Sequence, residues 1–257
     1  MYLSSRSNSQ IKYIRSLHQK KVRDQENRFL IEGMRLVEEA LALRWPLALV
    51  VRREGAPFLS LPPDLPQIEV PEALMSFLTT LASAPEYLAV AVQTPVQTPA
   101  LTRACFLLTA PLQDPRNLGA LLRLADALAL RGVWVLGQGV DLYHPRVLRG
   151  AMGSALRIPV RVLDSLTPLW ALKSAGWSFL AAAARGQLSS FQVAFPERTV
   201  LMLGSEGAGL PASLLAMADS TLAIPIAPQV ESLNVVTAAA MLLHEYARQY
   251  PLEGVAL

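Results

Sequence analysis

Three clusters of polar residues stand in apolar surroundings, and their side chains could bind and activate a ligand. The first lies in "QDPRNLGALLRLADAL", where Asn117 and Arg123 follow an apolar run that ends at Ala110. Asparagine can cap a helix, and a guanidinium can hold phosphate or stabilise developing negative charge. Taken alone, this cluster is better explained as a capped helix that carries an exposed arginine.

The second cluster is "LMLGSEGAGLP", which holds Gly204, Gly207 and Gly209 around Glu206. Glycines after an apolar strand let the backbone turn tightly and approach a ligand. The spacing is GxxGxG rather than the GxGxxG of dinucleotide-binding folds, and no Gly-Lys-Ser or Gly-Lys-Thr of a phosphate loop follows. A structural turn accounts for one glycine, and three glycines make a ligand loop an equally good interpretation.

The third cluster opens "ESLNVVTAAAMLLHEYA", where Glu231, Ser232 and Asn234 surround Leu233 ahead of an apolar run. Ser232 or Asn234 could cap a helix that begins there. Capping explains one polar side chain and leaves the others unexplained. The excess predicts that this helix begins at a binding site.

The elements around these clusters predict one shared location. From residue 104 onward, short apolar segments such as "CFLLTA", "RTVLMLG" and "STLAIPI" alternate with amphipathic segments. This alternation is typical of an α/β fold with a parallel sheet covered by helices on both faces. Ligands of such folds bind beyond the carboxyl ends of the strands, where all three clusters lie. We therefore expect the clusters to converge on one cleft.

A linker is predicted at "VQTPVQTPALTRA", which combines two prolines with polar residues and shows no periodicity. It divides the chain into a small α/β domain over residues 1–92, a linker over 93–103 and a larger domain over 104–257. Within the small domain we predict a helix from Ser9 to Lys20, a strand "RFLIEG", a helix from Met34 to Leu43, a strand "ALVVR", a helix over 72–79 and a strand "YLAVAV".

Charge is unevenly distributed along the chain. Residues 1–53 contain 11 Lys or Arg and 5 Asp or Glu, a balance of +6, whereas the other 204 residues contain 12 basic and 15 acidic residues, a balance of −3. This asymmetry indicates a basic surface for a polyanion such as RNA. A solvated helical face is an equally good explanation of the charge alone.

Several classes of protein are disfavoured. No apolar stretch reaches the roughly 18 residues that span a bilayer, and "MYLSSRSNSQIKY" lacks the apolar segment of a signal peptide. We therefore expect a cytoplasmic protein without a membrane partner. Cys105 is the single cysteine, which excludes a disulfide or a thiolate metal cluster within one chain. The three histidines lack ligand spacing, so no metal site is expected.

In order and spacing the three clusters resemble the motifs of the SpoU/TrmH-type RNA 2′-O-ribose methyltransferases of the SPOUT superfamily. The segments that carry the resemblance are "DPRNLGALLRLADAL", "LGSEGAGLP" and "IPIAPQVESLNVVTAAA". The N-terminal segment is similar to the ribosomal-protein-like RNA-binding domain of many members. Two departures are Ala151, where members commonly have Ser, and Ala227-Pro228, which replaces a Met-containing turn; the first could alter a substrate contact.

The resemblance implies methylation of a ribose 2′-hydroxyl in structured RNA by S-adenosylmethionine, with ribosomal RNA favoured over transfer RNA. It also implies a trefoil knot in the C-terminal parallel-sheet domain and a homodimer whose interface borders the active site. The implied catalytic residues are Asn117, Arg123, Glu206, Ser232 and Asn234, and the implied cofactor-binding residues are Gly204, Gly209, Ile224 and Leu233.

The mechanism implied for Arg123 leaves two alternatives. Family descriptions make this arginine the base that activates the ribose, but a guanidinium has a pKa above about 12 and remains protonated in proteins. We therefore favour an electrostatic role, in which Arg123, oriented by Asn117, holds a substrate phosphate or stabilises developing alkoxide charge. The alternative function is a non-catalytic RNA-binding or ribosome-assembly factor that retains the fold, and a base-methylating relative fits the motifs less well.

Overall fold

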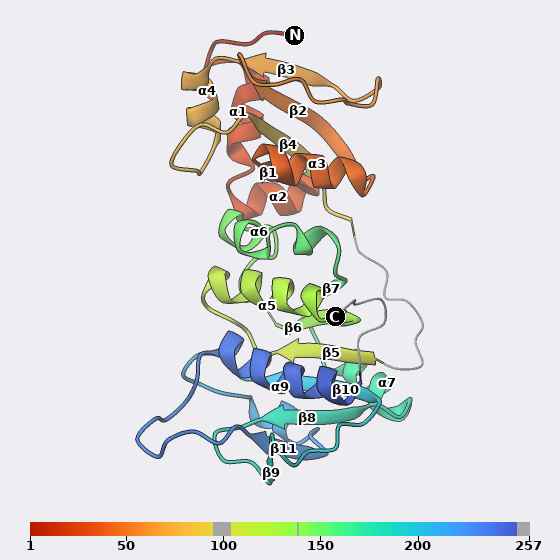
Figure 1. The fold of residues 1–257 in the computed structure, drawn as a ribbon. Coiled ribbons are helices and arrows are strands. Elements are labelled where there is room, and N and C mark those ends of the chain that lie inside the picture. The colour runs from red at the N-terminus through yellow and green to blue at the C-terminus, as the bar shows by residue number, and fades with distance from the viewer. Residues whose placement is uncertain (95–103, 138, 251–257) are drawn as a thin grey trace. The chain divides into compact units, whose positions relative to one another are not determined.

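The computed structural model describes residues 1–94, 104–137 and 139–250 (Figure 1). The chain forms two compact units. The first comprises Met1–Thr94 together with Asp141–Leu156, and the second comprises Pro95–Val140 together with Arg157–Leu257. Each unit is described separately below.

The first unit is built on a four-stranded sheet with the order β1-β4-β2-β3. Its strands are β1 (Arg28–Glu32), β2 (Leu47–Arg53), β3 (Gln67–Val70) and β4 (Tyr87–Val92). The pairs β1–β4 and β2–β4 are antiparallel, and β2–β3 is parallel. The apolar "YLAVAV" forms the central β4 because both of its faces are covered, and the β3 edge strand, which alternates polar and apolar residues, was not expected from the sequence.

The helices within Met1–Thr94 are α1 (Ser9–Ser16), α2 (Lys20–Glu26), α3 (Met34–Ala42) and α4 (Glu72–Leu78). The expected single helix from Ser9 to Lys20 is wrong, because α1 ends at Ser16 and a second helix begins at Lys20. The buried guanidinium of Arg23 donates hydrogen bonds to the carbonyl groups of Leu17 at 2.8 Å and His18 at 2.7 Å. These bonds satisfy backbone groups that the break between the helices exposes.

The segment Asp141–Leu156 completes the first unit. It contains α6 (Pro145–Ala151) and the 3-10 helix η1 (Ser154–Leu156), which are separated by left-handed residues, Met152 at φ 46° and Gly153 at φ 91°. This break corrects the expectation of one continuous helix through "HPRVLRGAMGSAL". Asp141 forms an ion pair with Arg23, and the Tyr143 ring stacks on Phe29 with centroids 4.3 Å apart. The domain boundaries predicted at residues 92 and 104 stay a prediction. The first compact unit also includes Asp141–Leu156, which lies after the predicted linker in sequence.

The second unit contains a seven-stranded sheet with the order β7-β6-β5-β10-β8-β11-β9. All of its strand pairs are parallel, which confirms the predicted parallel α/β fold. The strands are β5 (Ala104–Thr109), β6 (Gly132–Leu136), β7 (Val160–Leu163), β8 (Ser178–Ala182), β9 (Leu188–Ser189), β10 (Arg198–Leu203) and β11 (Ser220–Ala223). The two-residue β9 was not expected.

Helices cover this sheet, and α5 (Pro115–Ala127) packs beside α9 (Val235–Gln249) (Figure 1). The other helices are α7 (Thr167–Ser174) and α8 (Ala212–Leu215). A core that includes Phe106, Trp134 and Phe179 lies against the sheet, which explains why its strands are nearly continuous runs of apolar residues. The strand pairings do not test the trefoil knot, which stays a prediction. Among the described residues, no helix is both long and apolar enough to cross a membrane.

Candidate functional site

The three polar clusters each follow a strand of the parallel sheet. The first follows β5, which ends at Thr109, the second follows β10, which ends at Leu203, and the third follows β11, which ends at Ala223. Strands β5 and β10 pair directly, and β8 lies between β10 and β11. Because carboxyl ends of parallel strands share one edge of a sheet, the predicted convergence follows from this order.

Hydrogen bonds join one residue from each cluster. The Asn117 side-chain amide donates to Oε1 of Glu206 at 2.5 Å, and the Asn234 amide donates to Oδ1 of Asn117 at 3.3 Å. The backbone N–H of Gln113 donates to the other carboxylate oxygen of Glu206 at 3.3 Å. Segments separated by about half of the chain are thereby held in one polar network, which confirms that the clusters meet.

The position of Asn117 corrects one expectation from the sequence. Asp114, not Asn117, caps α5, and its carboxylate accepts a hydrogen bond from the backbone N–H of Arg116 at 2.8 Å. The helix begins at Pro115, whose ring presets the backbone angle of a first helical residue. Since Asp114 provides the cap, the amide of Asn117 is available for Glu206.

Of the two residues expected to cap the last helix, Ser232 and Asn234, it is Asn234 that caps α9. Its Oδ1 accepts a hydrogen bond from the backbone N–H of Val236 at 2.8 Å, and α9 begins at Val235. The Nδ2 group of the same side chain donates to Asn117. One asparagine therefore both starts the helix and contributes to the polar network.

Burial and hydrogen bonding act on Glu206 in opposite directions. Partial burial raises its pKa, whereas hydrogen bonds from the Asn117 amide and from nearby backbone N–H groups lower it, and the net pKa lies below the ordinary value. The carboxylate is therefore ionised at neutral pH. In that state it accepts hydrogen bonds only, so it fixes the amide orientation of Asn117.

The glycine loop closes on itself. A Cβ atom on Gly204 would lie 2.4 Å from the carbonyl carbon of Gly209, and Ser205 and Gly209 exchange backbone hydrogen bonds of 3.0 and 3.1 Å. Gly207 and Gly209 have φ angles of 86° and 68°, which side chains other than glycine rarely adopt. Close approach of the loop's own ends thus accounts for Gly204, and the left-handed turn accounts for the other two glycines.

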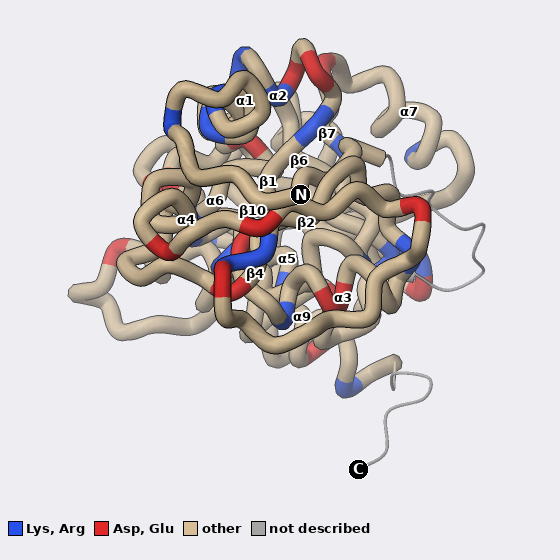
Figure 2. The backbone as a smooth tube through the Cα atoms, turned by 90° about the horizontal axis from the view of Figure 1, so that it is seen from above, with Lys and Arg blue, Asp and Glu red and all other residues tan. Residues whose placement is uncertain are grey.

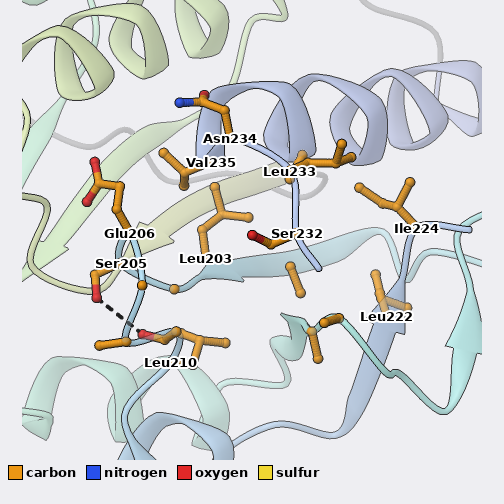
Figure 3. A pocket seen from close by; sticks show the side chains of 18 of the residues that line it. Leu203, Ser205, Glu206, Leu210, Leu222, Ile224, Ser232, Leu233, Asn234 and Val235 are labelled. Carbon is orange, nitrogen blue, oxygen red and sulfur yellow. Dashed lines mark hydrogen bonds between the residues drawn. The ribbon is translucent and has the colours of Figure 1, made fainter. Parts of the chain in front are cut away.

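A cavity of about 740 Å³ lies beside this network (Figure 3). It contains the positions expected to bind a cofactor and three of the expected catalytic residues: Gly204, Gly209, Ile224, Leu233, Glu206, Ser232 and Asn234. In Figure 3, Glu206 and Asn234 lie toward one end of the cavity, and Leu222 and Ile224 lie toward the other. The volume is that of a typical small-molecule site.

Three polar residues of the sequence motifs do not line the cavity, and one of them, Asn117, belongs to the polar network. Arg123 is exposed on α5, six residues after Asn117, and is not among the residues that line the cavity. Glu231 is also exposed and does not line it. Neither position is explained by ligand contacts within the cavity.

Sequence reasoning missed the contribution of β8. Ala182, Ala183 and Ala184, at the end of this strand, line the cavity together with Leu210 and Ile226. The signal was the apolar run "WSFLAAA" itself, because its strand ends at the same edge of the sheet as the three motifs. Small alanine side chains carry no chemical signature, so only the strand order reveals their role.

The cavity is lined mainly by small and apolar residues, with the hydroxyl groups of Ser205 and Ser232 among its polar groups. Its described lining includes the Glu206 carboxylate and contains no Lys, Arg or His. Burial raises the pKa of the Cys105 thiol to about 12, so this residue is not a thiolate at neutral pH. Within the ranges that the structure describes, His, Cys, Asp and Glu form no group of three that could hold a metal ion.

Comparison with protein families identifies both parts of the chain. The SpoU rRNA Methylase family matches residues 104–244, and the MRM3-like substrate binding domain matches residues 8–89. The first match includes all three polar clusters and more than half of the chain.

Relatives match almost the full length. A tRNA/rRNA methyltransferase of Synechocystis is 36% identical, with 96% of this chain and 93% of that protein covered. The 23S rRNA (guanosine(2553)-2′-O)-methyltransferase RlmP of Bacillus subtilis is 35% identical, with 94% of this chain and 97% of that protein covered.

Solved structures have the same fold. The AdoMet-bound rRNA methyltransferase of Sinorhizobium meliloti superposes with a TM-score of 0.87 at 27% identity, and the alignment covers 97% of this chain and 98% of that chain. The SpoU methyltransferase AviRb of Streptomyces viridochromogenes, in complex with AdoMet, gives a TM-score of 0.86 at 25% identity and covers 94% of this chain and 98% of that chain. The resemblance seen in the motifs is confirmed by these matches: the chain belongs to the SpoU rRNA methylase family and is an RNA 2′-O-ribose methyltransferase.

Proposed function

We propose that this protein transfers the methyl group of S-adenosylmethionine to the ribose 2′-hydroxyl of one nucleotide in ribosomal RNA. The observation that carries the proposal is the Asn117–Glu206–Asn234 network, in which Glu206 and Asn234 also line a small-molecule cavity. Relatives support the substrate class, because the Bacillus subtilis and Streptomyces viridochromogenes relatives are named as 23S rRNA 2′-O-methyltransferases.

The cavity residues fit S-adenosylmethionine. Leu222, Ile224 and Leu233 provide apolar surface for a nucleoside, and the glycine loop provides backbone groups without side chains in the way. The described lining holds no basic side chain that would repel a sulfonium. The bound cofactor supplies an activated methyl group, and the protein needs to align the substrate oxygen with it.

We assign Arg123 an electrostatic role toward the substrate. Its exposure on α5 allows contact with RNA, and helical side chains lean toward the N-terminus of their helix, which is the end that carries Asn117. A guanidinium remains charged, so Arg123 stabilises a phosphate or the developing alkoxide and does not take up the hydroxyl proton.

Asn117, Ser232 and Asn234 are assigned to placing the substrate and the cofactor. Asn117 is held at both ends of its amide, by Glu206 and by Asn234, and such a fixed group needs no reorganisation during the reaction. Ser232 lines the cavity immediately before α9. Gly204, Gly209, Ile224 and Leu233 are assigned to the cofactor.

A homodimer is the proposed assembly. The side chains of Phe191 and Met241 are 73% and 42% exposed, and they line a shallow apolar groove beside His244 on α9. The family resemblance implies a homodimer whose interface borders the active site, and Met241 lies on α9, the helix that follows Ser232 and Asn234. Light scattering at micromolar concentration should give twice the 27.9 kDa chain mass, and Phe191→Glu combined with Met241→Glu should give one chain mass. A wild-type protein of one chain mass would contradict the homodimer.

Methyl transfer tests the function directly. Purified protein is incubated with radiolabelled S-adenosylmethionine and in vitro transcribed 23S rRNA, 16S rRNA or transfer RNA, and the 2′-O-methyl site is mapped in the product. We expect transfer to 23S rRNA and saturable cofactor binding. Saturable binding with transfer only to transfer RNA would contradict the substrate class, whereas no cofactor binding and no transfer would favour a non-catalytic assembly factor.

A further inference from the structure

Two arginines of the first unit contact the same aromatic ring. The guanidinium carbons of Arg6 and Arg15 lie 4.8 and 5.2 Å from the centre of the Phe77 ring, so they are within about 10 Å of each other. Both arginines are exposed, and in the described part of the chain no ion pair joins either of them to a carboxylate. This separation is about one Debye length at roughly 0.1 M salt, so the two positive charges still repel each other. An anion bound between them would therefore be stabilised.

Further basic residues converge on the end of α4, at residues 78–80 directly after Phe77. Arg15 donates to the carbonyl oxygen of Thr79 at 3.5 Å, and Nε2 of His18 lies 2.7 Å from the carbonyl oxygen of Leu78. The guanidinium of Arg149, on α6 of the same unit, donates to Oγ1 of Thr80 at 2.9 Å. Attraction to the carbonyl groups at the C-terminus of α4 explains why His18 lies there and partly explains why Arg15 does. It does not explain the position of Arg6.

The carboxylate of Glu32 at this end of α4 is already committed to other partners. Its side chain is 4% exposed and accepts hydrogen bonds from Oγ1 of Thr79 at 3.0 Å and from both the backbone N–H and Oγ1 of Thr80 at 2.7 Å. Arg149 approaches it at 3.3 Å. Glu32 thus holds the loop after α4 and, being covered, leaves the charges of Arg6 and Arg15 facing solvent.

We propose that Arg6, Lys12, Arg15 and Phe77, here called the α1–α4 basic face, grip the phosphate backbone of the substrate RNA. Lys12 is exposed on α1, one turn before Arg15. Both guanidinium groups lie over the Phe77 ring, and their remaining N–H groups can donate to phosphate oxygens. Because the ring restricts both side chains before binding, less conformational entropy is lost when phosphate binds.

Two other observations support RNA as the partner. Residues 8–89, which include Lys12, Arg15 and Phe77, match a family described as a substrate binding domain. In Figure 2, Lys and Arg segments gather along α1 and α2 of this unit. The inference rests on the proposed function, since it takes the methylated RNA as the bound polymer.

The test measures binding of the full-length protein to fluorescently labelled, in vitro transcribed 23S rRNA fragments at several KCl concentrations. We expect Arg6→Ala combined with Arg15→Ala to weaken binding roughly 10-fold or more at low salt and to reduce the slope of log affinity against log salt by about 2, near 1 for each lost phosphate contact. Lys21→Ala combined with Arg35→Ala is the matched control, because it also removes two exposed positive charges of the first unit, from α2 and α3. Equal losses in the two double variants would overturn the assignment to this face.

Phe77→Leu tests the ring itself, since leucine keeps apolar packing and removes the surface on which the guanidinium groups rest. We expect a smaller loss of affinity than in the arginine double variant and an unchanged salt slope; wild-type affinity in Phe77→Leu would overturn the part assigned to the ring. In methyl transfer, the arginine double variant should raise KM for RNA and leave kcat and S-adenosylmethionine affinity unchanged. A wild-type protein that binds RNA but methylates none would overturn the proposed function and leave the α1–α4 basic face standing. An active wild-type protein, together with an arginine double variant whose KM for RNA is unchanged, would overturn the α1–α4 basic face and leave the proposed function standing.

Discussion

The cavity of the second unit and the α1–α4 basic face of the first unit recognise their ligands by opposite means. The cavity is lined by glycine backbone, small alanines and apolar side chains, and its single described carboxylate is held by amides. The basic face combines the exposed charged side chains of Arg6, just before α1, and of Lys12 and Arg15 on α1 with the half-buried ring of Phe77 on α4. A small ligand is therefore selected by shape at one site, and a polymer is attracted by charge at the other, so the two sites should differ in their response to salt and to substitution.

Not every basic residue of the N-terminal segment belongs to the binding surface. Arg23 and Arg52 are 2% and 8% exposed, and they are committed to Asp141 and to a stack over Phe58. The balance of +6 therefore overstates the basic surface by these two charges. Charge counted along a sequence cannot separate structural arginines from those that bind ligand.

The largest effect is expected for Arg23→Ala. Its guanidinium is buried, holds two backbone carbonyl groups and pairs with Asp141, so its removal leaves an uncompensated charge and unsatisfied carbonyl groups. The free energy of unfolding of the first unit should fall by about 3–5 kcal/mol, measured by urea denaturation. Lys20→Ala, which breaks the exposed pair with Asp24, should cost less than about 1 kcal/mol. Unchanged stability with weakened RNA binding would instead place Arg23 on the binding surface.

Arg123→Ala should lower methyl transfer by about two orders of magnitude, the usual scale for loss of one preorganised electrostatic group. S-adenosylmethionine affinity should stay within about twofold, because Arg123 does not line the cavity. Arg123→Lys separates its roles: a rate as low as that of the alanine variant shows that the planar fork matters, and a recovered rate shows that charge suffices. Normal turnover of Arg123→Ala at saturating RNA would show that the assignment is mistaken.

Gly204→Ala should weaken S-adenosylmethionine binding roughly tenfold, since one or two kcal/mol of strain in the loop produces a change of that size. The added Cβ would lie 2.4 Å from the backbone of Gly209, which has no flexible side chain to move away. RNA affinity should not change. Gly207→Ala is the control, because a Cβ there meets no atom within 4 Å and only the φ of 86° is strained. Calorimetric titration that gave equal affinities for Gly204→Ala and wild type would remove the loop from the cofactor site.

The smallest effect is expected for salt on cofactor binding. Between 50 and 200 mM KCl, the affinity for S-adenosylmethionine should change by less than about twofold, while RNA affinity should fall steeply because it depends on released counterions. Both are measured on the full-length protein, since removal of residues 1–92 would leave Asp141–Leu156 without the residues it packs against. If the affinities for S-adenosylmethionine and RNA fell equally with salt, the contrast between a site that selects by shape and a site that attracts by charge would be wrong.

Prediction from the sequence succeeded where one local pattern had one physical cause. The strand "YLAVAV" and the cap at Asn234 follow from continuous apolar character and from the preference of asparagine for helix starts. It failed where several local signals competed for the same helix boundary. Arg23 holds the carbonyl group of Leu17 where α1 ends early, and Asp114 rather than Asn117 caps α5 because Pro115 begins the helix.

The sequence by itself determined the alternation of strands and helices, the three motifs with their residue types and order, and hence the family. These properties depend on short-range periodicity and spacing, which the chain carries locally. Only the tertiary structure decided that Glu206 would hold Asn117, that the alanines after β8 would line the cavity, and that Arg6 and Arg15 would share Phe77. The reason is that strand order and packing bring together residues far apart in the chain, and side-chain partners across such distances leave no periodic trace in the sequence.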